Sequence, residues 1–269
     1  MVPRSLRNYL RTPSATLRWW LNERRPPVVF EVRPGWTLRC PRNAVTQAFH
    51  LQHDDPPQAR ELDDFIVLIK TLPEVRLLDI GCHYGIMSFA AAHYGGAEAQ
   101  ALAVDPSAAA GEMVGRIAVL NGMQSQVRFR RAAVGAELGE LEMIDAGVSA
   151  AGYMVLPGDQ PARDRQRIAQ TTIDQLATEM SAPPTVIKVD VESYELEVLR
   201  GGGRTLKEHA IPLCLEFHNA MMRARDVDPG QVTALLREYG YERYQCAGQT
   251  LSARDVVQPE IIRVIVTKA

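Results

Sequence analysis

The sequence lacks several features that would assign it to a class directly. Its four cysteines, Cys40, Cys82, Cys214 and Cys246, are scattered and form no C-x-x-C pair. This scatter excludes a disulfide framework and a zinc knuckle, and favours a reducing cytoplasm. No apolar run approaches the ~20 residues that span a membrane, and the basic N-terminus lacks the apolar core of a signal peptide. We therefore expect a cytoplasmic protein without a transmembrane segment.

The chain also lacks a strong charge of either sign. Lys and Arg total 30 against 32 Asp and Glu, which gives a formal net charge of −2. With no basic groove interleaved with aromatic residues, we expect no nucleic acid partner. A length of 269 residues suits one large α/β domain with a small appendage.

Two common phosphate-binding motifs are missing as well. There is no G-x-x-x-x-G-K-[ST] sequence, and His83 stands at the middle glycine position of a G-x-G-x-x-G motif. Instead, a hydrophobic strand with Asp79 near its end leads into a turn bracketed by Gly81 and Gly85. Strand, glycine turn and helix open a nucleotide-binding βαβ unit. A carboxylate there would repel a pyrophosphate and suits S-adenosylmethionine, a sulfonium with a ribose. The alternative is an ordinary glycine turn.

A second carboxylate supports the cofactor interpretation. The predicted strand 99–104 closes with Asp105, Pro106 and Ser107, 24 positions beyond Gly81. At about this spacing a strand-end carboxylate binds ribose hydroxyls. Two acids that each end a hydrophobic strand make an incidental glycine turn a weaker explanation.

Residues 1–25 form a basic arm with six arginines against one acid, Glu23. The arm could pack on its own domain or on a second copy of the chain, bind an anionic surface, or fray. We expect residues 1–60 to form an N-terminal extension and residues 61–269 to form the cofactor-binding domain. A homo-oligomer through the arm is one expected partnership.

The rest of the chain alternates apolar runs with turn residues, as in an α/β protein. Residues 50–57 predict a polar loop, and 145–169 a long loop that binds the acceptor or closes over it. The pattern also predicts a hairpin from 28–33 and 36–40, and helices near 62–72, 86–94, 107–121, 173–176, 194–199 and 229–239. Strands are expected at 77–80, 99–104, 127–134, 139–144, 186–190 and 213–216, with a closing hairpin from 242–246 and 261–266.

A cluster of ionisable residues follows two of these strands. Lys188, Asp190 and Glu192 alternate along one strand, and Glu216 and His218 along the next, so each set points one way. If the strands are neighbours, all five gather at the carboxyl edge of the sheet, where ligands bind in open α/β sheets. Burying this charge is costly unless the groups pair or hold a ligand. The alternative is a structural network in which Lys188 neutralises Asp190 or Glu216.

At this point the motifs themselves resemble a known family. The order D-I-G-x-x-x-G, V-D-P-S, A-V-G, T-I-D-Q-L, I-K-V-D-V-E-x-Y-E-x-E-V-L-R-G-G and L-x-L-E-x-H is similar to that of the FkbM family of S-adenosylmethionine-dependent methyltransferases, from Leu77 to Tyr241. The resemblance implies a Rossmann-like class I methyltransferase fold. We expect a mostly parallel seven-stranded sheet, a C-terminal antiparallel hairpin and an N-terminal helical and hairpin extension. It also implies O-methylation of a small or sugar-containing hydroxylated metabolite.

The resemblance assigns roles to individual residues. Asp105 would hold the cofactor ribose, and Asp190 would end the fourth strand over the methyl group. Two departures bear on acceptor choice: Cys82-His83-Tyr84 replaces the usual turn, and Ser193 stands where the family often has glycine. The full set of expected cofactor-binding residues is Asp79, Gly81, His83, Gly85, Asp105, Ser107, Val134 and Asp190.

The expected chemistry is an in-line displacement at the sulfonium methyl. The protein must align the nucleophile and help a hydroxyl lose its proton. His218 is the expected general base, since its ordinary pKa lies near neutrality, with Asp190, Glu216 and Lys188 as further catalytic residues. In the alternative role, Asp190, Glu192, Glu216 and His218 hold Mg²⁺ or Mn²⁺, which acidifies the hydroxyl.

Other function classes remain open. The chain could be a non-catalytic protein that binds the cofactor or a partner, or a methyltransferase that acts on nucleic acid or protein. An NAD-dependent dehydrogenase is disfavoured by His83 at the second glycine position.

Overall fold

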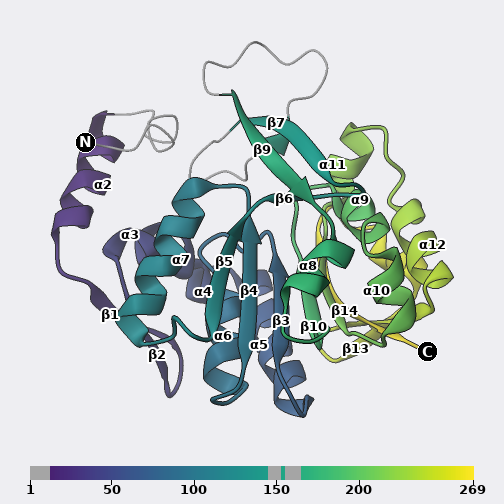
Figure 1. Cartoon of the computed structure of the whole chain (residues 1–269), viewed down its shortest axis with the longest axis horizontal. Coiled ribbons are helices and arrows are strands. Elements are labelled where there is room, and N and C mark those ends of the chain that lie inside the picture. Colours follow the sequence, from purple (N-terminus) through teal and green to yellow (C-terminus); the bar gives the residue numbers. More distant parts are fainter. Residues whose placement is uncertain (1–12, 145–152, 155–164) are drawn as a thin grey trace.

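A large sheet runs through the middle of the molecule (Figure 1). The structure is a computed structural model and describes residues 13–144, 153–154 and 165–269. Within these residues the sheet has eight strands in the order β13-β12-β14-β11-β10-β3-β4-β5. They are β3 (Arg76–Ile80), β4 (Gln100–Asp105), β5 (Val127–Arg131), β10 (Val186–Val189), β11 (Leu213–Phe217), β12 (Tyr241–Cys246), β13 (Gln249–Leu251) and β14 (Ile262–Lys268).

The strands from β11 to β5 are parallel, which confirms the predicted α/β class with a mostly parallel sheet. β14 lies antiparallel between β11 and β12. Seven strands were expected, but β13 adds a short eighth at the edge of the sheet. The tight hairpin is β12–β13, because β13 and α13 (Ala253–Val256) come between β12 and β14 in the chain.

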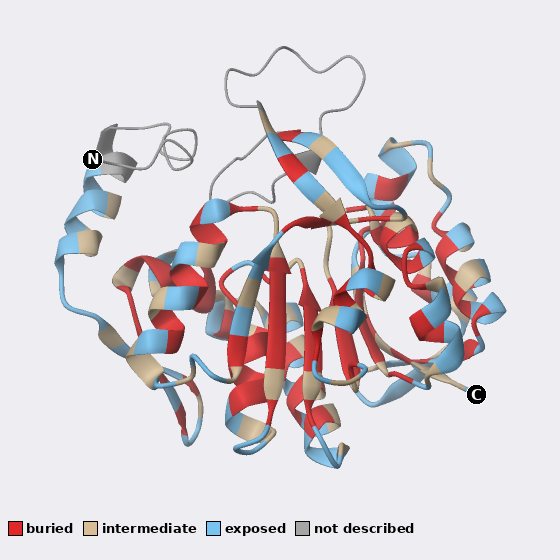
Figure 2. Cartoon of the chain, in the orientation of Figure 1, coloured by how far each residue is buried: buried red, intermediate tan, exposed pale blue. Residues whose placement is uncertain are grey.

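Helices cover both faces of the sheet, so its central strands are buried on both sides (Figure 2). Alternation decides which side chain meets which layer: Leu77 joins one apolar cluster, and Leu78 and Ile80 join the other. The first cluster holds α5 (Pro56–Thr71), α6 (Ile86–Tyr94) and α7 (Ala108–Asn121). The second holds α8 (Ile173–Glu179), α9 (Glu195–Arg200), α10 (Gly203–Glu208) and α12 (Gly230–Glu238).

A smaller sheet rises above the carboxyl ends of the central strands (Figure 1). Its order is β6-β9-β7-β8, from β6 (Ala133–Val134), β7 (Gly139–Ile144), β8 (Tyr153–Met154) and β9 (Arg165–Thr171). The single strand predicted at 127–134 is therefore wrong, because the chain leaves the large sheet at Ala132. The loop predicted at 145–169 is wrong at Tyr153–Met154 and from Arg165 onward, and its positions 145–152 and 155–164 lie outside the described residues.

The predicted N-terminal hairpin is confirmed as β1 (Val28–Arg33) and β2 (Trp36–Cys40). The predicted polar loop at 50–57 is wrong. It contains α4 (Leu51–Asp54) and the start of α5 at Pro56, where proline is tolerated in the first helical turn. The helix α3 (Arg42–Ala44) and the π-helical turn η1 (Val45–Phe49) lead into α4. The expected boundary between residues 60 and 61 falls inside α5.

The helix α2 (Pro13–Arg24) lies at the side of the molecule and contacts it through its C-terminal half (Figure 1). Glu23 pairs with Arg116 of α7 at 2.7 Å and accepts a hydrogen bond from Asn43 at 2.9 Å. None of the described helices is both long and apolar enough to cross a membrane.

Candidate active site

A cavity of about 540 Å³ opens at the carboxyl ends of β3, β4, β10 and β11. Three groups of residues line it. The strand ends and the turns after them contribute Gly81, Cys82, His83, Asp105, Ser107, Lys188, Asp190 and Glu216. The small sheet and its approach contribute Ala132, Val134, Gly135, Leu141, Met143 and Gln170. The N-terminal helices and the turn at 191–197 contribute Phe49, Gln52, Gln58, Glu61, Glu192, Tyr194 and Glu197.

The glycine turn after β3 packs directly against the end of β10. Gly81 has a φ of 73°, and a Cβ on it would lie 1.7 Å from the carbonyl oxygen of Asp190. No other residue fits there without moving one of the two strands. Gly85, with φ 78°, starts α6 behind the turn and is not part of the described lining.

Asp105 is held in place by the backbone. Its Oδ2 accepts a hydrogen bond from the His83 amide at 3.0 Å, and its Oδ1 accepts one from the Ser107 amide at 2.8 Å. The His83 backbone reaches this position with a φ of 49°. Burial raises the pKa of Asp105 to about 6, against the opposing effect of these two amides. The two amides therefore orient the carboxylate, which lines the cavity.

Asp79 lies one layer beneath the cavity and is not part of its described lining. Its Oδ2 accepts a hydrogen bond from the Ser88 hydroxyl at 2.6 Å, and its Oδ1 lies 4.0 Å from the Lys188 Nζ. Oδ1 has no hydrogen-bond partner among the described residues. Burial raises the pKa of Asp79, although Lys188 and Ser88 oppose that rise.

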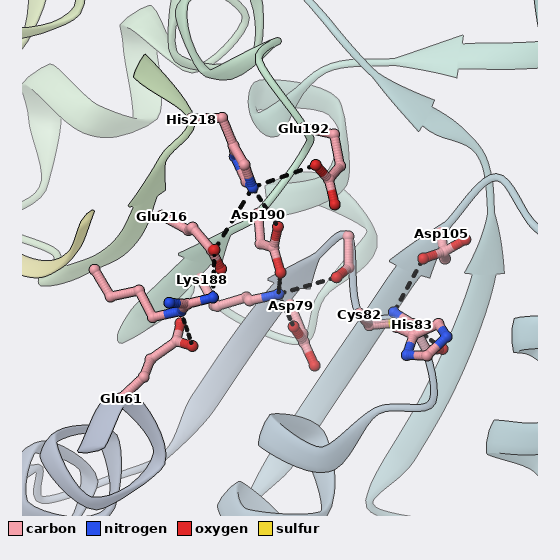
Figure 3. Close-up of polar contacts among 12 residues, drawn as sticks. Glu61, Asp79, Cys82, His83, Asp105, Lys188, Asp190, Glu192, Glu216 and His218 are labelled. Atoms are coloured by element: carbon pink, nitrogen blue, oxygen red, sulfur yellow. Dashed lines mark hydrogen bonds and ion pairs between the residues drawn. The ribbon is translucent and has the colours of Figure 1, made fainter. Parts of the chain in front are cut away.

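Lys188 joins the glycine turn to the ionisable cluster (Figure 3). Its ammonium donates to the Gly81 carbonyl at 2.9 Å and to Asp190 Oδ2 at 3.0 Å. Burial alone would lower the pKa of Lys188, but the charges of Asp190 and Asp79 outweigh it and raise the pKa above its ordinary value. The same pairing, with His218, holds the pKa of Asp190 below its usual range despite burial. The pairing of Lys188 with Asp190 is thus present, and the one with Glu216 is not.

His218 follows β11 and is only 3% exposed, behind the described lining. Its Nδ1 lies 2.7 Å from Glu195 Oε1, and its Nε2 faces Glu192 at 3.4 Å, Glu216 at 3.6 Å and Asp190 at 3.9 Å (Figure 3). Burial would lower the pKa of His218, but the bond to Glu195 and the surrounding carboxylates raise it to about 9. This value lies above the ordinary pKa for which His218 was chosen as the expected general base.

Glu195 is a site residue that sequence reasoning missed. It is fully buried, and its Oε1 also accepts a hydrogen bond from the Ser193 amide at 3.1 Å. Ser193 has a φ of 85° and Glu192 a φ of 51°, which suits the glycine often found at position 193 in the family. Arg225 binds the Ser193 carbonyl and stacks on the Tyr194 ring. The sequence does carry a signal for Glu195, which is the second acid of the V-E-x-Y-E motif. Alternation along a strand does not predict where this acid points, because Glu195 lies on α9.

Glu61 and Arg263 were missed as well. Arg263 of β14 lies 2.5 Å from Glu216 Oε1 and 3.1 Å from Glu61 Oε2 of α5, so one guanidinium serves two carboxylates. Burial raises the pKa of Glu61 to about 7 and that of Glu216 to about 8. No local pattern could find this pair, because its members come from opposite ends of the chain.

Three of the four expected metal ligands lie close together. Ligand atoms of Asp190, Glu192 and His218 all lie within 4.8 Å of one another. The fourth, Glu216, is bound to Arg263 instead. Mg²⁺ and Mn²⁺ accept carboxylate and imidazole ligands, so the ligand types of this group are compatible with either ion.

This fold and site define a nucleotide-cofactor protein of the open α/β class, with its cavity at the carboxyl edge of the sheet. A family model described as the methyltransferase FkbM domain matches residues 79–243. That match covers more than half of the chain, so the chain belongs to the FkbM methyltransferase family. The resemblance predicted from the motifs is confirmed.

Solved structures of several methyltransferases are similar to the chain. A methyltransferase FkbM from Methylobacillus flagellatus KT is 15% identical, with 74% of this chain and 47% of that one covered and a TM-score of 0.48. The chain thus spans about half the length of that protein. An O-methyltransferase from Bacillus cereus, in complex with SAH, is 9% identical over 84% of this chain and 87% of that one, with a TM-score of 0.47. A putative rRNA-methylase from Clostridium thermocellum is 8% identical over 78% and 96%, with a TM-score of 0.48. A search of curated proteins finds no match.

Proposed function

We propose that the protein is an S-adenosylmethionine-dependent O-methyltransferase that acts on a hydroxyl of a small or sugar-containing metabolite. The observation that carries this proposal is one cavity with Asp105 at one end and Lys188, Asp190 and Glu216 at the other. Direct methyl transfer needs the cofactor and the acceptor in one enclosed space. Membership of the FkbM methyltransferase family supports the same reaction.

The residues of the cavity fit this cofactor. The Asp105 oxygens each accept one backbone amide and keep lone pairs for the two ribose hydroxyls. Gly81 lines the cavity without a side chain, and Val134 adds an apolar surface to the lining. When bound, the cofactor supplies an electrophilic methyl group on its sulfonium.

The remaining task of the protein is to accept a proton from the hydroxyl. The proposed catalytic residues are His218, Asp190, Glu216 and Lys188, and each has a different role. Glu216 lines the cavity, and its pKa of about 8 makes it a stronger base than an ordinary carboxylate. His218 lies behind Glu216 and stabilises its charge. Lys188 fixes Asp190 against the glycine turn.

A second mechanism has its own observation, the approach of Asp190, Glu192 and His218 within 4.8 Å. These residues would hold Mg²⁺ or Mn²⁺, and the ion would acidify the acceptor hydroxyl. A chelator separates the two mechanisms. Activity abolished by EDTA and restored by Mg²⁺ or Mn²⁺ supports the ion, and unchanged activity leaves Glu216 as the proton acceptor, with His218 stabilising its charge.

Titration calorimetry with S-adenosylhomocysteine, followed by a screen of hydroxylated metabolites with methyl-labelled cofactor, tests the function. Binding and label uptake into a small molecule support the proposal. Binding with no uptake supports a non-catalytic protein, and label in RNA or protein supports a macromolecular acceptor. Absence of binding contradicts the proposal outright.

A further inference from the structure

The far end of the cavity from Asp105 is built partly by residues outside the family match. β4 and β5 lie on one side of β3, and β10 and β11 lie on the other. The cavity therefore has a cofactor end at Asp105 and, by the proposed function, an acceptor end beyond Asp190. We define the acceptor end by Glu61, Glu192, Tyr194 and Glu216, which line the cavity. Glu61 belongs to this end because it shares Arg263 with Glu216, and it precedes residue 79, where the family match begins. Phe49 and Gln52, which also precede residue 79, line the same cavity.

Cationic side chains at this end are already engaged. Lys188 is the only lysine or arginine in the described lining, and it binds Asp190 and the Gly81 carbonyl. The Arg263 guanidinium is divided between Glu216 and Glu61.

Negative charge is in excess around these cations. Six carboxyl groups (Glu61, Asp79, Asp190, Glu192, Glu195 and Glu216) share the cations Lys188, Arg263 and His218 through contacts of 4.0 Å or less. Buried carboxylates in excess must take up protons or bind a cation. The acceptor end therefore favours a cationic group, which can replace such protons, over a carboxylate or phosphate.

Gln52 gives an independent indication of a ligand. Gln52 is one of the lining residues and is only 6% exposed, and its buried Oε1 has no hydrogen-bond partner among the described residues. The position of the residue is fixed, because Arg33 donates to the Gln52 carbonyl at 3.2 Å and to the Ala59 carbonyl at 2.7 Å, which ties α4 to α5. A buried amide oxygen without a partner costs free energy until a donor reaches it.

We propose that the methyl acceptor is a hydroxylated small molecule that carries a protonated amine, and that Glu61 and Gln52 bind this amine. An ammonium group has three N–H donors and no acceptor, which matches a carboxylate and an amide oxygen. The inference rests on the proposed function and adds the charge class of the acceptor. It gives the N-terminal segment, through α4 and α5, a direct role in acceptor choice.

An acidic site could also bind a divalent cation. The residues that would bind a metal ion differ from those that would bind the amine. The group with metal-ligand geometry is Asp190, Glu192 and His218, and it contains neither Glu61 nor Gln52. Amine binding at Glu61 thus predicts a preference that persists in EDTA.

The test measures binding of matched acceptor pairs to the full chain saturated with S-adenosylhomocysteine, in EDTA. The probes are glucosamine, serinol and ethanolamine, each against its N-acetyl form, which keeps the hydroxyls and loses the charge. At least one amine should bind about tenfold or more tightly than its N-acetyl form, since a charge-assisted bond is lost. Glu61→Gln should remove that difference and leave S-adenosylhomocysteine affinity unchanged. Glu98→Gln, which removes an exposed acid at the opposite edge of the sheet, should preserve it.

The outcomes separate this inference from the proposed function. N-acetyl or neutral forms that bind as well as the amines overturn the inference, as does no amine binding by a protein that still binds S-adenosylhomocysteine. A preference for the amine that survives Glu61→Gln overturns the role of Glu61. Failure of the unsubstituted protein to bind S-adenosylhomocysteine overturns the proposed function and this inference with it.

Discussion

Asp105 accepts hydrogen bonds from two backbone amides, which fix the orientation of its carboxylate. We predict that Asp105→Ala weakens S-adenosylmethionine binding by about tenfold or more, since each charge-assisted hydrogen bond contributes about 1.5–3 kcal/mol. Calorimetry at pH 7.5 measures the affinity, and thermal unfolding shows whether the fold is retained. An unchanged affinity in a folded variant would remove Asp105 from the cofactor site.

The pKa of Asp105 adds a pH dependence with a defined sign. Burial raises this pKa to about 6, and only the ionised form accepts both ribose hydroxyls. Cofactor affinity should therefore be constant above pH 7 and fall about tenfold for each pH unit below 6. The cofactor-free protein should show the reverse effect from this group. Its folded state takes up the proton before the unfolded state does, so Asp105 contributes stability as the pH falls from 6 toward 4. Asp105→Asn should abolish both trends, and a binding curve that is flat from pH 5 to 8 would contradict this assignment.

Glu195 is expected to act through His218 as a positioning residue. Its carboxylate fixes the imidazole through Nδ1, which leaves Nε2 facing Glu192, Glu216 and Asp190. Glu195→Gln keeps the shape and removes the charge, so the pKa of His218 should fall from about 9. Glu195→Ala should also release the ring and lower kcat about 10- to 100-fold, as loss of an orienting partner does at other histidine sites.

An NMR titration of the His218 ring measures the first effect, and the pH–rate profile measures its consequence. Glu208→Gln, an exposed acid on α10, is the matched control and should change neither. If the pKa of His218 stays near 9 in Glu195→Gln, the other carboxylates hold its proton and Glu195 is merely structural.

At the scale of the elements, the turn between β3 and α6 sets how closely the glycine motif meets β10. We predict that Gly81→Ala destabilises the protein by about 3 kcal/mol or more, because the added Cβ overlaps the Asp190 carbonyl. Gly96→Ala is the matched control, since Gly96 also has a positive φ, 86°, but has open space around it. Gly96→Ala should destabilise the protein by only about 1 kcal/mol, because alanine is strained in the left-handed backbone conformation. Chemical unfolding measures both values, and equal losses would show that φ alone explains Gly81.

Most elements of the large sheet could be predicted, because buried parallel strands are short apolar runs that end at turn residues. The strand before Gly81 and the helix that ends at Gly95 are examples. The small sheet could not be predicted well. β9 alternates arginine and glutamine, and Ile168 is its only buried apolar residue, so it resembles a polar loop. The end of β5 before Ala132 could not be predicted either, because apolar residues continue through Val134 into the second sheet.

Only part of the site could be predicted from the sequence. Asp105 and Asp190 end strands, so their place at one sheet edge follows from topology. The approach of Glu192 to His218 depends on positive φ angles at Glu192 and Ser193, which strand alternation does not describe. The link from Glu61 through Arg263 to Glu216 depends on α5 packing against β14 across the whole fold.

At the scale of the whole molecule, the N-terminal arm divides into an anchored face and an exposed face. Trp19 packs against the main apolar cluster, and Glu23 binds Arg116 and Asn43. On the other face Leu17 is 55% exposed, and Trp20 and Leu21 are each 39% exposed. We propose that this second face contacts a second copy of the chain, as expected for the arm from its sequence. The division into residues 1–60 and 61–269 stays a prediction. The helix α5 crosses that boundary, and Glu61, directly after it, lines the cavity.

The last prediction follows from where the cavity begins. Its described lining starts at Ala48, so the part of the arm that the structure describes, residues 13–25, does not line it. Deletion of residues 1–25 should leave S-adenosylhomocysteine affinity within about twofold, because sites without shared contacts act independently. The same deletion should shift the sedimentation of the protein toward the monomer. Leu17→Ser with Leu21→Ser should do so too, while keeping the anchoring contacts of Glu23. A cofactor affinity that falls more than about tenfold on deletion would show that the arm reaches the cofactor site. A sedimentation coefficient equal to that of the intact chain would instead show that the exposed face of α2 does not join two copies.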